Sequence, residues 1–216
     1  MDITWLGQTC FRLRGRDVSL LTDPFPETGL KLSALSADIV TLSHRDPKTD
    51  QAPPEVQAIK EVRRVIAGPG EYEIAGALIN GIQTFRDGQS GKVRGKNTAY
   101  LIEIDGVVVC HLGDIGHVPS AAQISDMGRA DVLIVPIGGA GGLDVRGAVE
   151  AINQIGPKLA IPMRYRIDLS TADLEPVEKL LQEMGLSGVE TQQRLTVTPT
   201  TMPLETRVVL LEPRAS

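Results

Sequence analysis

The sequence predicts a layered α/β sandwich formed by a single domain that spans residues 1–216. Its first half consists of short apolar segments separated by glycine and charged turns, which is typical of a strand meander. The second half alternates strand patterns with helical patterns, and the continuous apolar run 131–137 is typical of a strand buried on both faces. Mixed sheets with helices outside them predict a layered sandwich. A length of 216 residues fits one domain, and no long linker divides the chain.

The expected elements follow from local patterns. The Asp105-Gly106 pair predicts a hairpin turn. Asp144 is a plausible N-cap, and Gly156 and Gly185 are expected to end helices. The expected strands are 3–6, 10–13, 18–22, 38–42, 64–67, 71–74, 77–85, 98–104, 107–111, 131–137, 158–163, 194–198 and 206–211, and the expected helices are 54–62, 120–127, 145–155 and 173–184.

Composition excludes several classes of protein. With 22 basic and 27 acidic residues the chain carries a net charge of -5, and this mild acidity argues against a nucleic-acid partner. No apolar run approaches the roughly 20 residues of a membrane helix, so we expect no membrane association. The N-terminus lacks the pattern of a signal peptide, and Cys10 and Cys110 are expected to be buried, reduced thiols. We therefore expect a cytoplasmic protein, with homo-oligomerisation left open.

Chemistry-bearing residues follow three expected strands. His44 follows strand 38–42, Asp114 follows strand 107–111, and Arg164 follows strand 158–163. Groups at the carboxyl ends of strands often share one cleft in α/β folds, although each residue alone could belong to an ordinary turn. Their joint occurrence favours a common site.

Eight short motifs lie in order along the chain: Ile3-Thr-Trp-Leu-Gly-Gln-Thr-Cys-Phe11, Thr22-Asp-Pro-Phe25, Leu42-Ser-His44, Gly68-Pro-Gly-Glu-Tyr-Glu-Ile74, Arg94-Gly-Lys-Asn-Thr98, Cys110-His-Leu-Gly-Asp-Ile-Gly-His117, Val135-Pro-Ile-Gly-Gly139 and Ile161-Pro-Met-Arg-Tyr165. Together they resemble the metallo-β-lactamase superfamily, in its small single-domain, Zn-dependent hydrolase branch. The resemblance implies a four-layer αββα sandwich with a cleft for one or two zinc or similar ions. Such ions activate a water molecule that attacks an ester, lactone, amide or phosphodiester.

Most metal-ligand positions of the family are substituted in this sequence. His44 and Asp114 match the family pattern, and Asp46 could act as an oxygen ligand in place of a histidine. The remaining family positions are occupied by Gln8, Lys48, Thr49, Arg86 and Arg164. If the alignment of this loop is wrong by two residues, Asp50 is the motif aspartate instead.

The substitutions limit the metal chemistry. Arginine stays protonated and has no free lone pair, so Arg86 and Arg164 cannot bind a metal. The chain has three histidines, and two of them, His111 and His117, lie at non-ligand positions. We therefore expect no dinuclear centre. Either His44, Asp46 and Asp114 hold one zinc or other divalent ion and are the catalytic residues, or the protein holds no metal.

The cationic replacements suggest a second function. Lys48, Arg86 and Arg164 could replace the positive charge of the missing ions beside the carboxylates of the cleft. They would then form a salt-bridge network able to hold a small anionic ligand. The sequence thus leaves open a hydrolase-like protein with a degenerate metal site and a non-catalytic binding or scaffold protein. A nucleic-acid processing enzyme is disfavoured by the acidity of the chain.

Two other histidines and a glycine-rich loop have structural interpretations. We expect His111 to be a buried, hydrogen-bonded core residue and His117 to help form the turn into the next helix. The segment Gly138-Gly-Ala-Gly-Gly142 lacks the residues of a phosphate-binding loop, so we interpret it as a loop at the cleft edge, with anion binding as the minor alternative.

Overall fold

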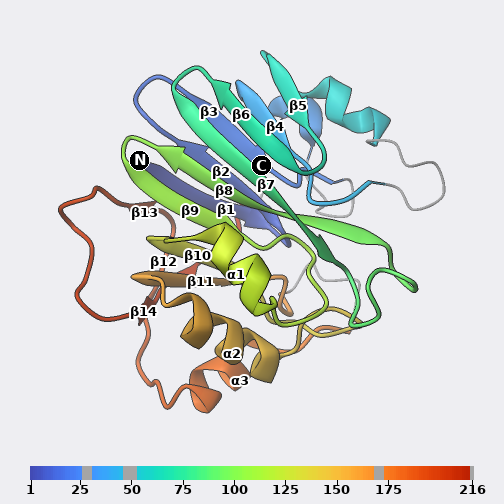
Figure 1. Ribbon diagram of the computed structural model, residues 1–216. Helices are drawn as coiled ribbons and strands as arrows, with labels where there is room; N and C mark the ends of the chain where they lie inside the picture. The colour runs from blue at the N-terminus through green and yellow to red at the C-terminus, as the bar shows by residue number, and fades with distance from the viewer. Residues whose placement is uncertain (26–30, 46–52, 168–172, 215–216) are drawn as a thin grey trace.

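The structure is a computed structural model that describes residues 1–25, 31–45, 53–167 and 173–214. Two β-sheets pack against each other, and helices lie on the outside (Figure 1). The strand order of the first sheet is β13-β1-β2-β3-β4-β5, with β1 (Asp2–Gly7), β2 (Cys10–Arg14), β3 (Ser19–Thr22), β4 (Ile39–Thr41), β5 (Arg64–Ile66) and β13 (Leu195–Thr196).

The second sheet is longer and mixed. Strands β6 to β9 are antiparallel neighbours, whereas β9, β10, β11 and β14 run parallel. Its order is β14-β11-β10-β9-β8-β7-β6, with β6 (Gly70–Ile74), β7 (Ala77–Phe85), β8 (Lys96–Ile104), β9 (Val107–His111), β10 (Val132–Pro136), β11 (Leu159–Met163) and β14 (Arg207–Val208). A small separate pair joins β12 (Thr191–Gln192) to β15 (Leu210–Leu211).

The helices form the outer layers. Over the second sheet lie α1 (Ala121–Met127), α2 (Val145–Ile155) and α3 (Val177–Glu183). The first sheet packs against two short 3-10 helices, η2 (Leu32–Ala34) and η3 (Pro54–Ala58). The predicted α/β sandwich is therefore confirmed, with a thinner helical layer on the side of the first sheet. In the described part of the chain, no helix is long and apolar enough to cross a membrane.

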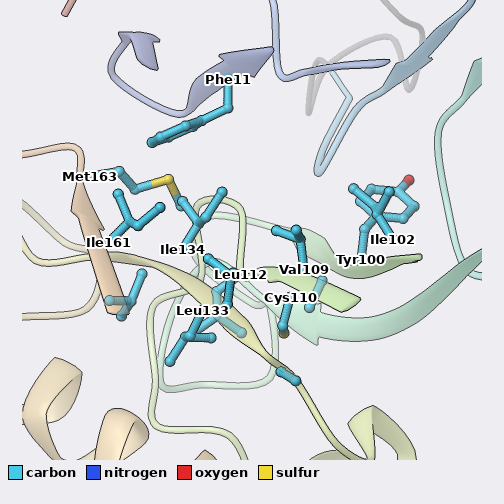
Figure 2. Packing of buried hydrophobic residues seen from close by; sticks show 14 of the residues in the cluster. Phe11, Tyr100, Ile102, Val109, Cys110, Leu112, Leu133, Ile134, Ile161 and Met163 are labelled. Atoms are coloured by element: carbon cyan, nitrogen blue, oxygen red, sulfur yellow. The ribbon is translucent and has the colours of Figure 1, made fainter. Parts of the chain in front are cut away.

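Alternation along the strands builds two hydrophobic clusters. In β3, Leu20 belongs to the main cluster between the sheets, whereas its neighbour Leu21 packs toward η2 and η3. Figure 2 shows the same alternation in β10, where Ile134 points toward Phe11 and Leu133 lies on the side of the helices. Since both faces of these strands are buried, the strands form a rigid platform whose connecting loops meet at one edge.

Several predicted boundaries need correction. The expected helix 54–62 is only the 3-10 helix Pro54–Ala58, and the expected strand 206–211 is broken into β14 and β15. The expected helix 173–184 begins at Val177, because Pro176 is the N-cap and the amide of Glu175 donates to Gly138 O instead. Helix 145–155 is confirmed, with the Asp144 side chain accepting from the amide of Gly147.

Candidate functional site

Four loops at one edge of the sheets form the candidate site, with Asp114 at its centre. Asp114 follows β9, and Arg164 follows β11, which is separated from β9 by β10 in the second sheet. Arg86 and Arg94 lie in the loop that joins β7 to β8, and His44 follows β4 of the first sheet. Because β9, β10 and β11 are parallel, their carboxyl ends deliver side chains to the same cleft.

Three guanidinium groups contact the carboxylate of Asp114. The Nε and Nη2 atoms of Arg86 lie 2.9 and 2.8 Å from Oδ2, and Nη2 of Arg94 lies 2.9 Å from the same oxygen. The Nε atom of Arg164 lies 3.0 Å from Oδ1, as a close ion pair without the alignment of a hydrogen bond. Asp114 has only 5% of its side chain exposed, so three partly buried cations surround one buried anion.

The loop before β8 is shaped around Asp87. Its carboxylate accepts from the backbone amides of Gln89, Gly91, Val93 and Arg94, at 2.8, 2.9, 3.1 and 2.6 Å. These hydrogen bonds, led by the one from Arg94, lower the pKa of Asp87 to about 2. Arg94 is thereby placed so that its Nη1 donates to Arg86 O at 3.0 Å while its Nη2 reaches Asp114.

Arg164 is held in an unusual backbone conformation. Its φ of 52° lies in the left-handed region, which non-glycine residues seldom adopt and which is common at functional sites. Its Nη1 donates to Gly139 O at 3.0 Å. Gly138 packs so closely on this residue that a Cβ there would lie 2.0 Å from Arg164 O. The segment 138–142 therefore lies at the cleft edge, as predicted, where it supports Arg164.

His44 lies beside the arginine cluster at the end of a hydrogen-bonded chain. The amide and Oγ of Ser43 donate to Asp23 at 2.6 and 2.7 Å, and the Ser43 Oγ lies 3.1 Å from His44 Nδ1. Burial, reinforced by the charge of Arg86, lowers the pKa of His44 to about 4, so the imidazole is neutral at pH 7. Burial raises the pKa of Asp23 to about 7 despite its bonds from Ser43.

A cavity of about 620 Å³ opens next to these groups. His44 and Arg94 border it on the side of the cluster, and Arg45 and Lys96 contribute further positive charge. Tyr72 and Pro69, which are less polar, also line it. No carboxylate lines this cavity within the ranges that the structure describes, so the local charge is positive.

The other two histidines and the two cysteines lie outside the arginine cluster. His111 is completely buried, with Nε2 2.9 Å from Thr9 O and Nδ1 accepting from the amide of Gly113, as its interpretation as a core residue predicts. His117 accepts from the amide of Phe85 at 3.3 Å and links the turn before α1 to β7. Cys10 and Cys110 are buried free thiols, as predicted.

The structure brings some of the predicted site residues together, whereas others lie outside the described residues. Arg86 and Arg164 both contact Asp114, and His44 lies beside them. The predicted residues Asp46 and Lys48, and the alternative Asp50, lie outside the described residues. Arg94 was not predicted as a site residue, although it starts the family motif Arg94-Gly-Lys-Asn-Thr98. Asn97 of that motif accepts from the Asp114 amide at 3.0 Å, which anchors the loop after β9.

The described side chains of this site form no metal-ligand cluster of the family type. Among the side chains that the structure describes, no three histidines, cysteines, aspartates or glutamates lie close enough together to hold an ion. Asp114 Oδ1 lacks an aligned hydrogen bond and could offer one ligand, and His44 could offer a second. Catalytic zinc usually requires three protein ligands, whereas arginines occupy the space around this carboxylate.

The two-sheet architecture with its cleft at the strand ends defines a protein of the metallo-β-lactamase fold class. Residues 2–164 match the family described as the Beta-lactamase superfamily domain, and the chain belongs to this superfamily. A UPF0173 metal-dependent hydrolase of Thermoplasma acidophilum is 30% identical over 211 residues, covering 86% of this chain and 92% of the relative. Another, from Archaeoglobus fulgidus, is 30% identical over 220 residues, covering 86% and 93%.

Solved structures support the same assignment. The crystal structure of a proposed Zn-dependent hydrolase of the metallo-β-lactamase superfamily from Thermotoga maritima superposes with a TM-score of 0.80. It is 33% identical, and the match covers 97% of each chain. Igni18, a metallo hydrolase from Ignicoccus hospitalis, is 20% identical with a TM-score of 0.60, covers 91% of this chain and 99% of its own, and shares the fold.

Proposed function

We propose that this member of a metal-dependent hydrolase family has a degenerate metal site and binds a small anion in an arginine-lined cleft. The observation that carries the proposal is the contact of Arg86, Arg94 and Arg164 with the single carboxylate of Asp114. Three guanidinium groups and one carboxylate leave two positive charges in excess. A cleft with this charge favours an anion over a second cation.

The chemistry of arginine supports an anionic ligand. Two divalent ions would contribute a total of about four positive charges to such a cleft. The arginines replace part of that charge without a metal. Guanidinium groups match the geometry of carboxylates and phosphates better than a lysine ammonium does. The cavity beside the cluster, bordered by Arg94, Arg45 and Lys96, provides about 620 Å³ for a ligand. Small-molecule pockets usually have volumes of about 300–1,000 Å³.

Metal analysis together with anion titration tests this proposal. The full chain is purified without chelators, its zinc, manganese and iron are measured, and its melting temperature is recorded with increasing inorganic phosphate. We expect metal well below one ion per chain and a phosphate-dependent rise in melting temperature. The rise is expected to disappear in Arg94→Gln and to persist in the control Arg146→Gln, whose side chain is 86% exposed on α2.

A mononuclear hydrolase is the competing function. Relatives 30% identical are named metal-dependent hydrolases, and Asp114 Oδ1 is a buried oxygen without an aligned hydrogen bond. One zinc or other divalent ion would then be held by His44 and Asp114 together with Asp46. Stoichiometric metal in the wild type that is lost in His44→Ala, together with no response to phosphate, would overturn the proposed anion site.

A further inference from the structure

A second surface of the molecule combines apolar and acidic side chains on the outer face of β6 to β9. The register places Glu73 opposite Leu78, Leu78 opposite Glu103, and Glu103 opposite Val108. In the next row Glu71 lies opposite Asn80, and Asn80 lies opposite Leu101. Paired residues project from the same face of a sheet, so these side chains share one surface.

This face forms a shallow hollow with an apolar floor. Its volume is about 610 Å³, and α1 borders it through Asp126 and Met127. Leu78, the second residue of β7, is 47% exposed although it is a large apolar side chain. Helices α2 and α3 lie over the other end of this sheet, away from β6 and β7 (Figure 1). Within the described ranges, no helix covers the floor formed by Leu78, Leu101 and Val108.

Four carboxylates surround the floor without a cation to neutralise them. They are Glu71, Glu73, Glu103 and Asp126, and none of them forms an ion pair with any residue that the structure describes. The one cation at the rim, Arg129, lies 3.3 Å from Asp131 instead. This surface therefore presents apolar area bordered by uncompensated negative charge, which is the reverse of the arginine-lined cleft.

We propose that this acidic face docks a basic amphipathic helix of a partner protein. Glu73 on β6 and Glu103 on β8 are separated by β7, so their backbones lie about 9.5 Å apart, twice the spacing of neighbouring strands. An α-helix with its side chains is about 10–12 Å wide. A helix lying along β7 can therefore place an apolar stripe on Leu78 while lysines or arginines on both flanks reach the carboxylates.

The charge of the face argues against a second copy of this chain as its occupant. In a two-fold dimer the same patch contacts itself, which would place Glu73 and Glu103 of one copy against like charges of the other. Like charges across an interface are costly, whereas a basic helix gains both apolar burial and charge complementarity. The expected mode is an amphipathic helix whose apolar stripe lies on a groove.

Calorimetric titration of the full chain with a designed helical peptide tests the proposal. The probe is a 16-residue peptide of leucine and lysine, with the leucines on one face. Two control peptides carry glutamate for lysine or the same residues in scrambled order. We expect saturable binding of the amphipathic lysine peptide alone. Binding should weaken at least about tenfold in Glu73→Lys/Glu103→Lys and in Leu78→Ser, which removes apolar contact.

A matched charge control separates this face from the general acidity of the chain. Glu183→Lys/Glu190→Lys changes the net charge equally at two exposed carboxylates elsewhere, and its affinity for the peptide should stay within about twofold of wild type. Equal weakening by both double variants, equal binding of the scrambled peptide, or no binding would overturn the proposal. So would self-association in sedimentation that Leu78→Ser abolishes, because the occupant would then be a second copy.

Discussion

At the scale of single residues, Asp114 controls the charge of the cleft. Its carboxylate is the group that holds Arg86, Arg94 and Arg164 within ion-pair distance of one centre. Asp114→Asn keeps the shape but leaves three partly buried cations without their anion. We expect the free energy of unfolding to fall by about 3–5 kcal/mol. Urea unfolding followed by the fluorescence of Trp5, the only tryptophan, measures the change.

Two comparisons make this result specific. Glu150→Gln removes an exposed carboxylate of α2 and should change stability by less than about 0.5 kcal/mol. Phosphate should recover part of the stability lost in Asp114→Asn, because an anion can then take the place of the carboxylate. An Asp114→Asn protein as stable as wild type would contradict the view that the arginines depend on this charge.

Buried His111 predicts how stability changes with pH. Burial lowers its pKa to about 4 in the folded protein, whereas an unfolded histidine titrates near 6.5. The unfolded state therefore binds more protons between these values, and up to about 3 kcal/mol of stability is lost as the pH falls from 6.5 to 4. NMR titration of the three histidine rings tests this, since His111 should stay neutral at pH 5.5. A midpoint near 6.5 for His111 would contradict its burial.

The pH dependence is opposed by Asp23. Its pKa is raised to about 7 by burial, so the folded state binds the proton that the unfolded state releases above pH 3.8. This contribution to stability decreases as the pH rises from 3.8 to 7, which is the opposite sign to that of His111. Between about pH 4 and 6.5 the contributions of His111 and Asp23 to stability therefore largely cancel, so these two groups together predict little net change there.

At the scale of elements, the loop between β7 and β8 determines whether Arg94 reaches the site. Four backbone amides of this loop converge on the Asp87 carboxylate, and the last belongs to Arg94 itself. Asp87→Ala should open the loop, raise hydrogen exchange across 88–95, and weaken phosphate binding about as much as Arg94→Gln does. The exposed turn substitution Asp17→Ala serves as control. Unchanged exchange in Asp87→Ala would show that other contacts hold the loop.

Local signals explain which elements the sequence predicted well. The helix 145–155 was predicted correctly because its cap at Asp144 and its left-handed end at Gly156 are encoded within the helix itself. The helix 173–184 was predicted too long because Leu174 continues the apolar spacing. Its structure is decided by a distant partner instead, since the Glu175 amide bonds Gly138 O. Periodicity alone contains no information about such tertiary hydrogen bonds.

In the candidate site, too, residues marked by local signals were predicted, and a residue placed by tertiary contacts was not. Arg86 and Arg164 were predicted because they replace histidines at family positions close to strand ends. Arg94 was missed because it reaches Asp114 only after the Asp87 loop folds, and it lies nine residues beyond the end of β7 at Phe85. The roles of Asp46 and Lys48 stay predictions, because both lie outside the described residues.

At the scale of the whole molecule, the stacking of the two sheets depends on contacts that no single strand encodes. Tyr100 of β8 in the second sheet reaches the first sheet through its hydroxyl. The hydroxyl donates to Leu42 O at 3.0 Å and accepts from the amide of Gly68 at 2.9 Å. Leu42 and Gly68 follow β4 and β5, so one buried side chain ties the ends of two strands to the opposite sheet.

Tyr100→Phe tests how far this single connection stabilises the sandwich. The substitution keeps the ring in the core but leaves the Leu42 carbonyl and the Gly68 amide without their partner. We expect a loss of about 1–3 kcal/mol in the free energy of unfolding, measured in urea. Tyr72→Phe is the matched control, because its hydroxyl only approaches Pro69 O at 3.4 Å on the surface. Since Leu42 is followed directly by Ser43 and His44, Tyr100→Phe should also speed hydrogen exchange at the amides of these two residues. If Tyr100→Phe and Tyr72→Phe lower the free energy of unfolding equally, the sheets are held together by apolar packing alone.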